Sequence, residues 1–266
     1  MNIKFILAAI GIMYLSGSAS SYAMDVNASV YAGVEEYQWE EYDPNTGSQL
    51  IKITGPRVLV GLNLAPKLQS NLFALDYDVS MYEGTLNYAS QTVDAGTGAS
   101  IPFSSDVAYM GFNSHFDGIF TGFGNQLEPV LTLGFEGWRR SLDSRTINES
   151  TGAVTAIGYA ENWAMIYTKL GLRGEVDKFS WDAGLKLPLS VTNTTDYLQA
   201  TTHPKGLLGG YIGADYAFAN TWKLGLDYEA TRFGQSDPAN SILGANSVVQ
   251  PKSDEDVIML SLNKAF

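Results

Sequence analysis

The chain of 266 residues contains no cysteine and only two histidines. A disulfide scaffold, a thiolate zinc site, an iron–sulfur cluster and a cysteine nucleophile are therefore excluded. Charged residues are also scarce, at 17% of the chain against roughly 25% in typical soluble domains. Acidic residues outnumber basic ones by 28 to 16, and the net charge is −12. This balance argues against nucleic acid as a partner, because phosphate contact needs a basic surface.

Long apolar runs are missing outside the first segment of the chain. Residues 1–23 combine a basic start at Lys4, an apolar run over residues 5–15 and small residues that end at Ala23. This layout predicts a cleaved secretory signal peptide over 1–23. A membrane anchor helix would need roughly 20 apolar residues, and this run is too short. We therefore expect an exported protein with a single domain over 24–266.

The exported part of the sequence alternates with a period of two. Over residues 179–190 the odd positions hold apolar or aromatic side chains, and the even positions hold polar residues, glycine or proline. Residues 221–232 repeat the pattern. Successive side chains of a β-strand point to opposite faces, so each segment has one apolar and one polar face. Such runs predict ten strands, at residues 26–39, 55–65, 72–84, 105–116, 127–139, 158–175, 179–190, 206–218, 221–233 and 254–266.

The connections between these strands alternate between long and short. The long ones contain 15 to 20 residues that are rich in Asn, Asp, Gly, Ser, Thr and Pro, and the short ones include residues 117–126. With an even number of strands, this layout resembles bacterial outer-membrane β-barrels. The resemblance implies an all-β fold: a closed antiparallel transmembrane barrel of about ten strands, with long extracellular loops and short periplasmic turns. It also implies the outer membrane as location, with membrane lipid and lipopolysaccharide as partners.

The last strand and the aromatic residues support this resemblance. The chain ends in Phe266, with Leu262 and Leu260 at alternate positions before it. This ending resembles the terminal strand that the barrel-assembly machinery reads, although Lys264 stands where an apolar residue is usual. Aromatic residues also gather at the predicted strand ends, as in the girdles of membrane barrels, which favours a barrel over a secreted β-sandwich. The girdle at the short turns is predicted to contain Phe179, Trp181, Phe218, Trp222 and Phe266, and the outer girdle Trp39, Tyr82, Trp138, Trp163 and Phe233.

The inner face of the predicted strands decides what the barrel can do. It carries six basic and nine acidic side chains. Twelve of these are predicted to line the lumen: Arg57, Asp76, Asp78, Glu136, Lys169, Arg173, Asp182, Lys186, Asp215, Lys223, Asp227 and Glu229. The other three are Glu128, Arg140 and Glu175. Either opposite charges pair and close the lumen as a polar core, or they line a narrow water-filled path whose acidic excess favours cations.

Catalytic and cofactor-binding motifs are not recognisable. Neither His115 nor His203 lies in a zinc-type HExxH pattern, and there is no G-x-S-x-G nucleophile elbow. The chain resembles the omptin proteases only in part. These proteases are ten-stranded barrels with acidic residues and an Asp–His pair at the outer rim. Asp76 and Asp78 are predicted near the periplasmic start of their strand. Asp196 and His203 belong to the fourth long loop, at the other end. The sequence therefore predicts a protein without enzymatic activity, cofactor or metal.

Acidic residues also cluster at the outer ends of the first and last strands. The two clusters are Glu35, Glu36, Glu40, Glu41 and Asp43, and Asp254, Glu255 and Asp256. First and last strands are neighbours in a closed barrel, so divalent cations that bridge the clusters to lipopolysaccharide phosphates are one hypothesis. Residues 43–48 open like a calcium loop but lack its later bidentate Glu, so they are predicted to form a turn.

Two classes of function remain open from the sequence. The first is a narrow porin-like channel for ions or small solutes. The alternative is a closed structural or adhesive barrel that binds envelope or host components through its loops. An omptin-like or lipid-A-modifying enzyme is a minor alternative. A monomer is expected, as the default for a small barrel.

Overall fold

The computed structural model describes residues 26–67, 72–93, 100–123, 126–143, 145–149, 152–156, 158–241 and 247–266. The predicted signal peptide over 1–23 lies outside the described residues. Within this part of the chain, none of the helical structure has the length and apolar character that crossing a membrane requires.

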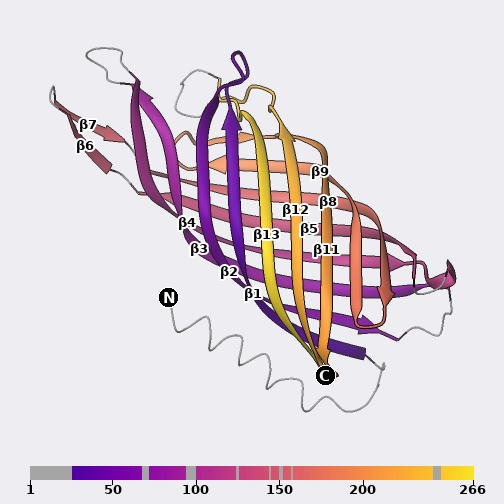
Figure 1. Cartoon of the computed structure of the whole chain (residues 1–266). Coiled ribbons are helices and arrows are strands. Elements are labelled where there is room, and N and C mark those ends of the chain that lie inside the picture. Colours follow the sequence, from indigo (N-terminus) through magenta and orange to yellow (C-terminus); the bar gives the residue numbers. More distant parts are fainter. Residues whose placement is uncertain are drawn as a thin grey trace, which may run out of the picture.

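Ten strands form a closed antiparallel barrel (Figure 1). Their bounds are β1 (Val26–Tyr42), β2 (Gln49–Pro66), β3 (Ala74–Val93), β4 (Ser100–Ile119), β5 (Glu128–Leu142), β8 (Tyr159–Val176), β9 (Phe179–Thr195), β11 (Lys205–Ala219), β12 (Trp222–Gly234) and β13 (Lys252–Ala265). Each strand pairs with the next in this order, and β13 pairs with β1 to close the barrel. The predicted fold class and the ten predicted strands are confirmed. Closure removes the unpaired strand edges that lipid would not tolerate.

Short elements lie in the connections between these strands. β6 (Arg145–Glu149) and β7 (Gly152–Ala156) form a hairpin in the third long connection (Figure 1). β10 (Ala200–Thr202) pairs with β9, and the single-turn 3-10 helix η1 (Thr121–Phe123) follows β4. We call the end of the barrel with the short connections the turn end, and the opposite end the loop end.

The strands extend further toward the loop end than predicted. β3 continues to Val93 rather than residue 84, and β4 begins at Ser100 rather than residue 105. On β4, Phe112 is exposed on the outer face, whereas nearer the loop end Phe103 is buried inside and Ser104 is exposed outside. The period of two persists, but the apolar residues change face. The sequence prediction required an apolar outer face and therefore placed the ends of these strands too close to the membrane.

This extension determines how the barrel stands in a membrane. A transmembrane strand needs about 9–11 residues, whereas β3 and β4 have 20 residues each. About half of each strand therefore lies beyond the membrane on the loop side, where the outer face is polar and the inner face is apolar.

Residues 43–48 form the predicted turn between β1 and β2. The Oδ1 atom of Asp43 accepts hydrogen bonds from the backbone N–H groups of Asn45 at 2.7 Å and Thr46 at 2.9 Å. These two donors lower the pKa of Asp43, with Thr46 contributing most. The turn then passes through Gly47, whose φ is +71°, a value that residues with a Cβ rarely adopt.

The Gly47→Ala variant should lose about 1 kcal/mol of unfolding free energy, because alanine is strained at this positive φ. The measurement is the urea midpoint of the protein folded into lipid vesicles. Asn45→Ala is the control in the same turn, and it should leave the midpoint unchanged because Asn45 does not have a positive φ. An equal effect of both variants would contradict the assignment to Gly47.

Candidate functional site

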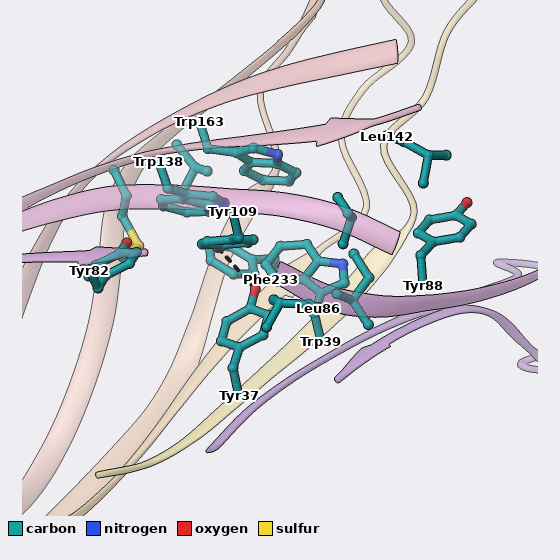
Figure 2. Close-up of a cluster of buried hydrophobic side chains, with 14 of the residues drawn as sticks. Tyr37, Trp39, Tyr82, Leu86, Tyr88, Tyr109, Trp138, Leu142, Trp163 and Phe233 are labelled. Atoms are coloured by element: carbon teal, nitrogen blue, oxygen red, sulfur yellow. Dashed lines mark hydrogen bonds between the residues drawn. The ribbon is translucent and has the colours of Figure 1, made fainter. Parts of the chain in front are cut away.

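An aromatic cluster, which we call the plug, fills the lumen toward the loop end (Figure 2). It consists of Tyr37, Trp39, Tyr82, Tyr109, Trp138, Trp163 and Phe233. None of these side chains is more than 4% exposed. They come from six different barrel strands, so the plug ties the walls together across the interior.

The rings meet from opposite walls of the barrel. Trp39 on β1 and Trp163 on β8 are five strands apart around a barrel of ten, which is the largest possible separation. Their ring centroids are nevertheless only 5.1 Å apart, and Trp163 stacks on Trp138 at 5.3 Å. Rings in contact at these distances leave no room for water between them.

The plug corrects a prediction from the sequence. Five of its members, Trp39, Tyr82, Trp138, Trp163 and Phe233, were expected in the outer aromatic girdle, facing lipid. They lie inside the barrel because the strands continue beyond the membrane, where the apolar residues occupy the inner face. At the turn end, by contrast, Phe179, Phe218 and Phe266 are exposed on the outside, as predicted.

Two buried arginines are built into the plug. Arg57 lies 4.1 Å from the ring centroid of Tyr37 and 4.2 Å from that of Tyr82, and its Nη2 atom is 2.7 Å from Glu35. Desolvated contacts of a guanidinium with aromatic faces are favourable by about 2 kcal/mol. The tyrosines and Arg57 thus form one layer of the plug, directly below the tryptophans.

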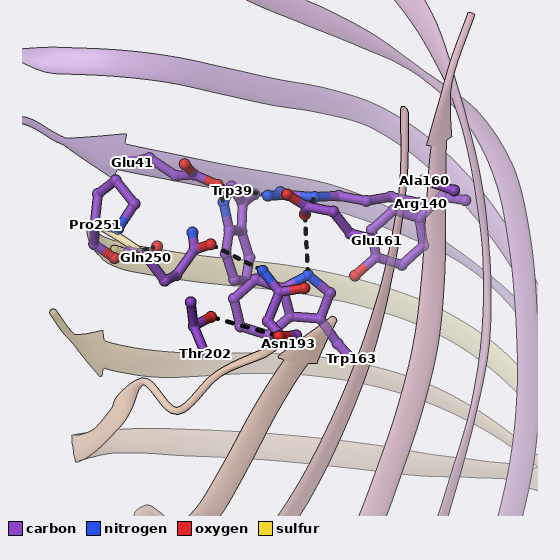
Figure 3. A network of polar contacts seen from close by, with 12 residues as sticks. Trp39, Glu41, Arg140, Ala160, Glu161, Trp163, Asn193, Thr202, Gln250 and Pro251 are labelled. Atoms are coloured by element: carbon purple, nitrogen blue, oxygen red, sulfur yellow. Dashed lines mark hydrogen bonds and ion pairs between the residues drawn. The ribbon is translucent and has the colours of Figure 1, made fainter. Parts of the chain in front are cut away.

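Arg140 lies in the tryptophan layer between two glutamates (Figure 3). Its Nη2 atom is 2.6 Å from Glu41, and its Nε atom donates to Glu161. The same carboxylates accept hydrogen bonds from the indole N–H groups of Trp39 at 2.9 Å and Trp163 at 3.1 Å. Glu41 and Glu161 therefore contact both the guanidinium of Arg140 and the indoles of Trp39 and Trp163, so the ion pairs and the ring packing position the same side chains.

Polar contacts at the loop end close the barrel above the plug (Figure 3). The side-chain amide of Asn193 donates to Gln250 at 2.8 Å, and the backbone N–H of Gln250 donates to the hydroxyl of Ser236 at 2.9 Å. Ser241 donates to the carbonyl of Leu198 at 2.6 Å. These contacts bind the fourth and fifth long connections to the strand ends.

Below the plug, the lumen widens into a polar cavity of about 950 Å³. Its lining reaches Asn220, Thr221 and Phe266 at the turn end, so the cavity opens on that side. Eleven of the twelve predicted lumen residues line it, and Lys186 does not. The ammonium of Lys186 still reaches the interior, where it lies 2.5 Å from Glu229.

Several charges in the cavity lie in ion pairs. Arg173 bridges Asp76 and Glu128, with both distances 2.9 Å. Glu229 accepts from both Lys169 and Lys186. Buried ions need such partners, and here acid and base come from different strands. Asp182, Asp215 and Asp227 have no lysine or arginine within 4.0 Å among the described residues.

The structure adds acidic side chains that were not predicted to line the lumen. Glu35, Glu41, Asp117, Glu161 and Glu255 all point into the barrel. Asp117 was assigned to a short turn, but β4 continues to residue 119 and keeps Asp117 on the inner face. Glu35 and Glu41 were assigned to an exposed cluster, although they share the strand parity of the plug residues between them. This shared parity is the feature of the sequence that could have predicted their inward position.

Within the two acidic clusters expected at the loop end, successive side chains alternate between the inner and the outer face of the barrel. The clusters do lie together, since Glu40 pairs with Asp254 across β1 and β13. However, Glu40 is 3.2 Å from Lys52, and Asp256 is 2.7 Å from Arg232, on the outer face. The described residues contain no group of three His, Asp or Glu side chains arranged to hold a metal ion. The cation-bridging hypothesis therefore finds no preformed site in them.

The residues of the omptin comparison are not brought together. Asp76 and Asp78 line the cavity near the turn end. Asp196 lies at the loop end, where it accepts a hydrogen bond from the backbone N–H of Ala160 at 2.7 Å. His203 is exposed seven residues further along the chain. His115 instead lies 3.6 Å from Asp117, inside the cavity. The prediction that the chain is not an enzyme stays a prediction.

The outer face between the two ends is apolar. Leu131, Leu170 and Leu226 are each more than half exposed on different strands, as lipid-facing residues should be. On the last strand Leu260, Leu262 and Phe266 are likewise exposed. Their role in assembly stays a prediction.

Lys264, which departs from the usual terminal pattern, has an explanation in the structure. Its ammonium lies 5.4 Å from the ring centroid of Trp222 and 5.1 Å from that of Phe266. A lysine at the membrane boundary can cover aromatic rings with its chain and keep its charge in water. The aromatic girdle at the turn end thus accommodates the charge.

Comparisons with known proteins give a consistent fold. No protein-family profile and no curated protein matches the sequence. The outer membrane protease OmpT from Escherichia coli matches with a TM-score of 0.57 at 12% identity, over 94% of this chain and 99% of that one. The translocator domain of the autotransporter NalP from Neisseria meningitidis has a TM-score of 0.48 at 11% identity, over 98% and 97%. An outer membrane channel from Pseudomonas putida F1 has a TM-score of 0.45 at 12% identity, over 94% and 98%.

These similarities concern the fold and not the activity. A shared fold does not fix an activity, which depends on the side chains of the individual barrel. With its closed barrel and apolar outer band, the chain is a bacterial outer-membrane β-barrel protein.

Proposed function

We propose that this barrel is closed to solutes and acts through its extracellular surface, as a structural or adhesive protein. The contact between Trp39 and Trp163 from opposite walls carries the proposal, because it places aromatic rings across the full width of the lumen. Ten strands enclose a lumen only somewhat wider than that of eight strands, which side chains just fill, and far narrower than that of open porins with sixteen or more strands.

The depth of the plug supports closure. Tyr37 and Trp39 are two residues apart on β1, so the tyrosine and tryptophan layers are separated by about 7 Å along the strand. Tyr37 donates to or accepts from Tyr109 at 3.0 Å, across the space below the tryptophans. A conducting path would require both layers to move, against the ion pairs of Arg57 and Arg140.

The shape of the loop end supports a role at the cell surface. β3 and β4 rise beyond the membrane, and the β6–β7 hairpin extends from the same end (Figure 1). The contacts of Asn193 and Gln250 fix further loop segments in place. A rigid surface binds with a lower entropic cost than a mobile one. We expect lipopolysaccharide beside this surface, and envelope or host components on top of it.

A narrow channel is the second candidate. The cavity of about 950 Å³ favours it, since the turn half of the lumen already offers water and ions a polar space. In this case the plug would act as a gate. An omptin-like site has no comparable support, because Asp76 and Asp78 are separated from Asp196 and His203 by the length of the barrel.

Conductance of the refolded protein in a planar lipid bilayer tests the proposal. We expect no discrete current steps from protein whose folded state is shown by heat-shifted migration on a gel. Steps that change in cation selectivity when Asp227 and Glu229 are replaced by alanine would contradict closure and support the channel. For the surface role, replacing residues 145–156 with a short Gly-Ser turn should abolish adhesion of displaying cells while the barrel still folds.

A further inference from the structure

Three acidic side chains of the cavity form a group on one wall. Asp182 on β9, Asp215 on β11 and Asp227 on β12 all line the cavity. None of them has a lysine or arginine within 4.0 Å in the part of the chain that the structure describes. Of the cations that line the cavity, Lys169 binds Glu229, and Arg173 binds Asp76 and Glu128. Lys223 on β12 lies on the same wall but makes no ion pair with the three aspartates in the described part of the chain. The wall therefore carries three carboxylates against one lysine, and its net charge is negative.

The backbone register makes two of these carboxylates converge. Gly213 on β11 pairs with Asp182 on one side and with Asp227 on the other. A Cβ atom added at Gly213 would lie 2.4 Å from the Oδ1 atom of each aspartate. Both oxygens thus point into the space that the missing side chain leaves free. The arrangement is a shallow acceptor site, open to the cavity.

A second observation is that buried polar atoms at the inner end of the cavity have no hydrogen-bond partner. Glu255 lines its inner end, is only 4% exposed, and has an Oε2 atom without a hydrogen-bond partner. The Nη1 atom of Arg57, at the same end, is also unpartnered. Buried polar atoms are satisfied in nearly all proteins, by protein groups, water or ligands. At the inner end of the cavity, Glu255 therefore leaves one acceptor oxygen for the donor group of a ligand, whereas Nη1 of Arg57 is a donor.

The chemistry of the site selects the class of ligand. An acceptor set with excess negative charge favours a cation, and a metal ion is disfavoured because, among the residues that the structure describes, no three carboxylate or imidazole groups are arranged around one point. Ammonium groups on a flexible chain can instead reach aspartates that are spread over three strands. The cavity of about 950 Å³ falls within the range of roughly 300–1,000 Å³ that small-molecule sites occupy.

We propose that the cavity binds a linear polyamine from the periplasmic side, with its ammonium groups on Asp182, Asp215 and Asp227. The opening at the turn end admits the ligand, and the plug prevents it from crossing. The site is independent of the surface role proposed above, because the ligand and the loop end are on opposite sides of the plug.

Isothermal titration of the folded protein in detergent micelles with spermidine tests this proposal. Wild type should show saturable binding. The double variant D182N/D227N should bind about 10- to 100-fold more weakly, because asparagine keeps an acceptor oxygen but both negative charges are lost. The matched control is D106N/D237N, which removes two exposed carboxylates outside the cavity and should leave affinity unchanged. Heat-shifted gel migration verifies that each variant is folded.

Gly213→Ala tests the geometry without changing charge. Its methyl group would displace the Oδ1 atoms of both aspartates, so spermidine affinity should fall while the barrel still folds. Absence of saturable binding to wild type, or equal affinity of D182N/D227N, would overturn the proposal. So would Mg²⁺ that binds as tightly as spermidine with the same dependence on Asp182 and Asp227, because the site would then be one for divalent ions.

Discussion

Replacing Trp39, Trp163, Tyr37 and Tyr109 together with serine should turn a silent barrel into a conducting one. The four side chains provide the ring contact between opposite walls in the tryptophan layer and the contact between β1 and β4 in the tyrosine layer. Serine leaves a void that is lined by polar groups, including Arg140 and its glutamate partners, and a polar void of this size fills with water. Planar-bilayer recording should show discrete steps, with cation selectivity from the acidic cavity below.

The matched control for this experiment removes aromatic rings from the outside of the barrel. Phe112 and Phe135 form a contact with centroids 5.5 Å apart on the lipid-facing side. F112A/F135A should remain silent, because these rings do not border the lumen. If the folded plug variant also stays silent, the seal does not lie in the tryptophan and tyrosine layers. Each variant requires heat-shifted migration as evidence of folding, since loss of a packed aromatic side chain costs about 3–5 kcal/mol.

Arg140→Met should destabilise the barrel by about 3–5 kcal/mol, because it leaves the carboxylates of Glu41 and Glu161 buried without a counter-ion. Arg140 and Glu41 are each at most 4% exposed in their side chains, so water does not compensate the loss. The measurement is the free energy of unfolding in guanidinium, followed by tryptophan fluorescence of protein in lipid vesicles.

A triple variant separates charge from packing. R140M/E41Q/E161Q should recover most of the stability, because glutamine oxygens still accept from the indoles of Trp39 and Trp163 and no charge remains buried. Lys205→Met is the control for a cation in an exposed ion pair, whose side chains are 63% and 86% exposed, and it should change the unfolding free energy by less than about 1 kcal/mol. An effect of Arg140→Met as small as that of Lys205→Met would contradict the importance of the buried network.

The sequence by itself determined the barrel. Lipid-facing side chains such as Leu131 and Leu133 must be apolar because they contact lipid, so their alternation can be recognised without knowing which residues pack together inside the barrel. The strand number follows from the same runs, and closure follows because lipid leaves no alternative for strand edges. The inward position of Asp182 and Asp227 also follows from parity.

Only the tertiary structure decided whether the lumen is open. Trp39 and Trp163 alternate correctly for strand residues, but the sequence does not state which face lies inward once a strand has left the membrane. Beyond the lipid, the interior is the more apolar environment, so the preference of the two faces reverses. Contact between residues 124 positions apart is then set by the circumference of the barrel and the register of its strands, and neither quantity is local to any segment of the chain.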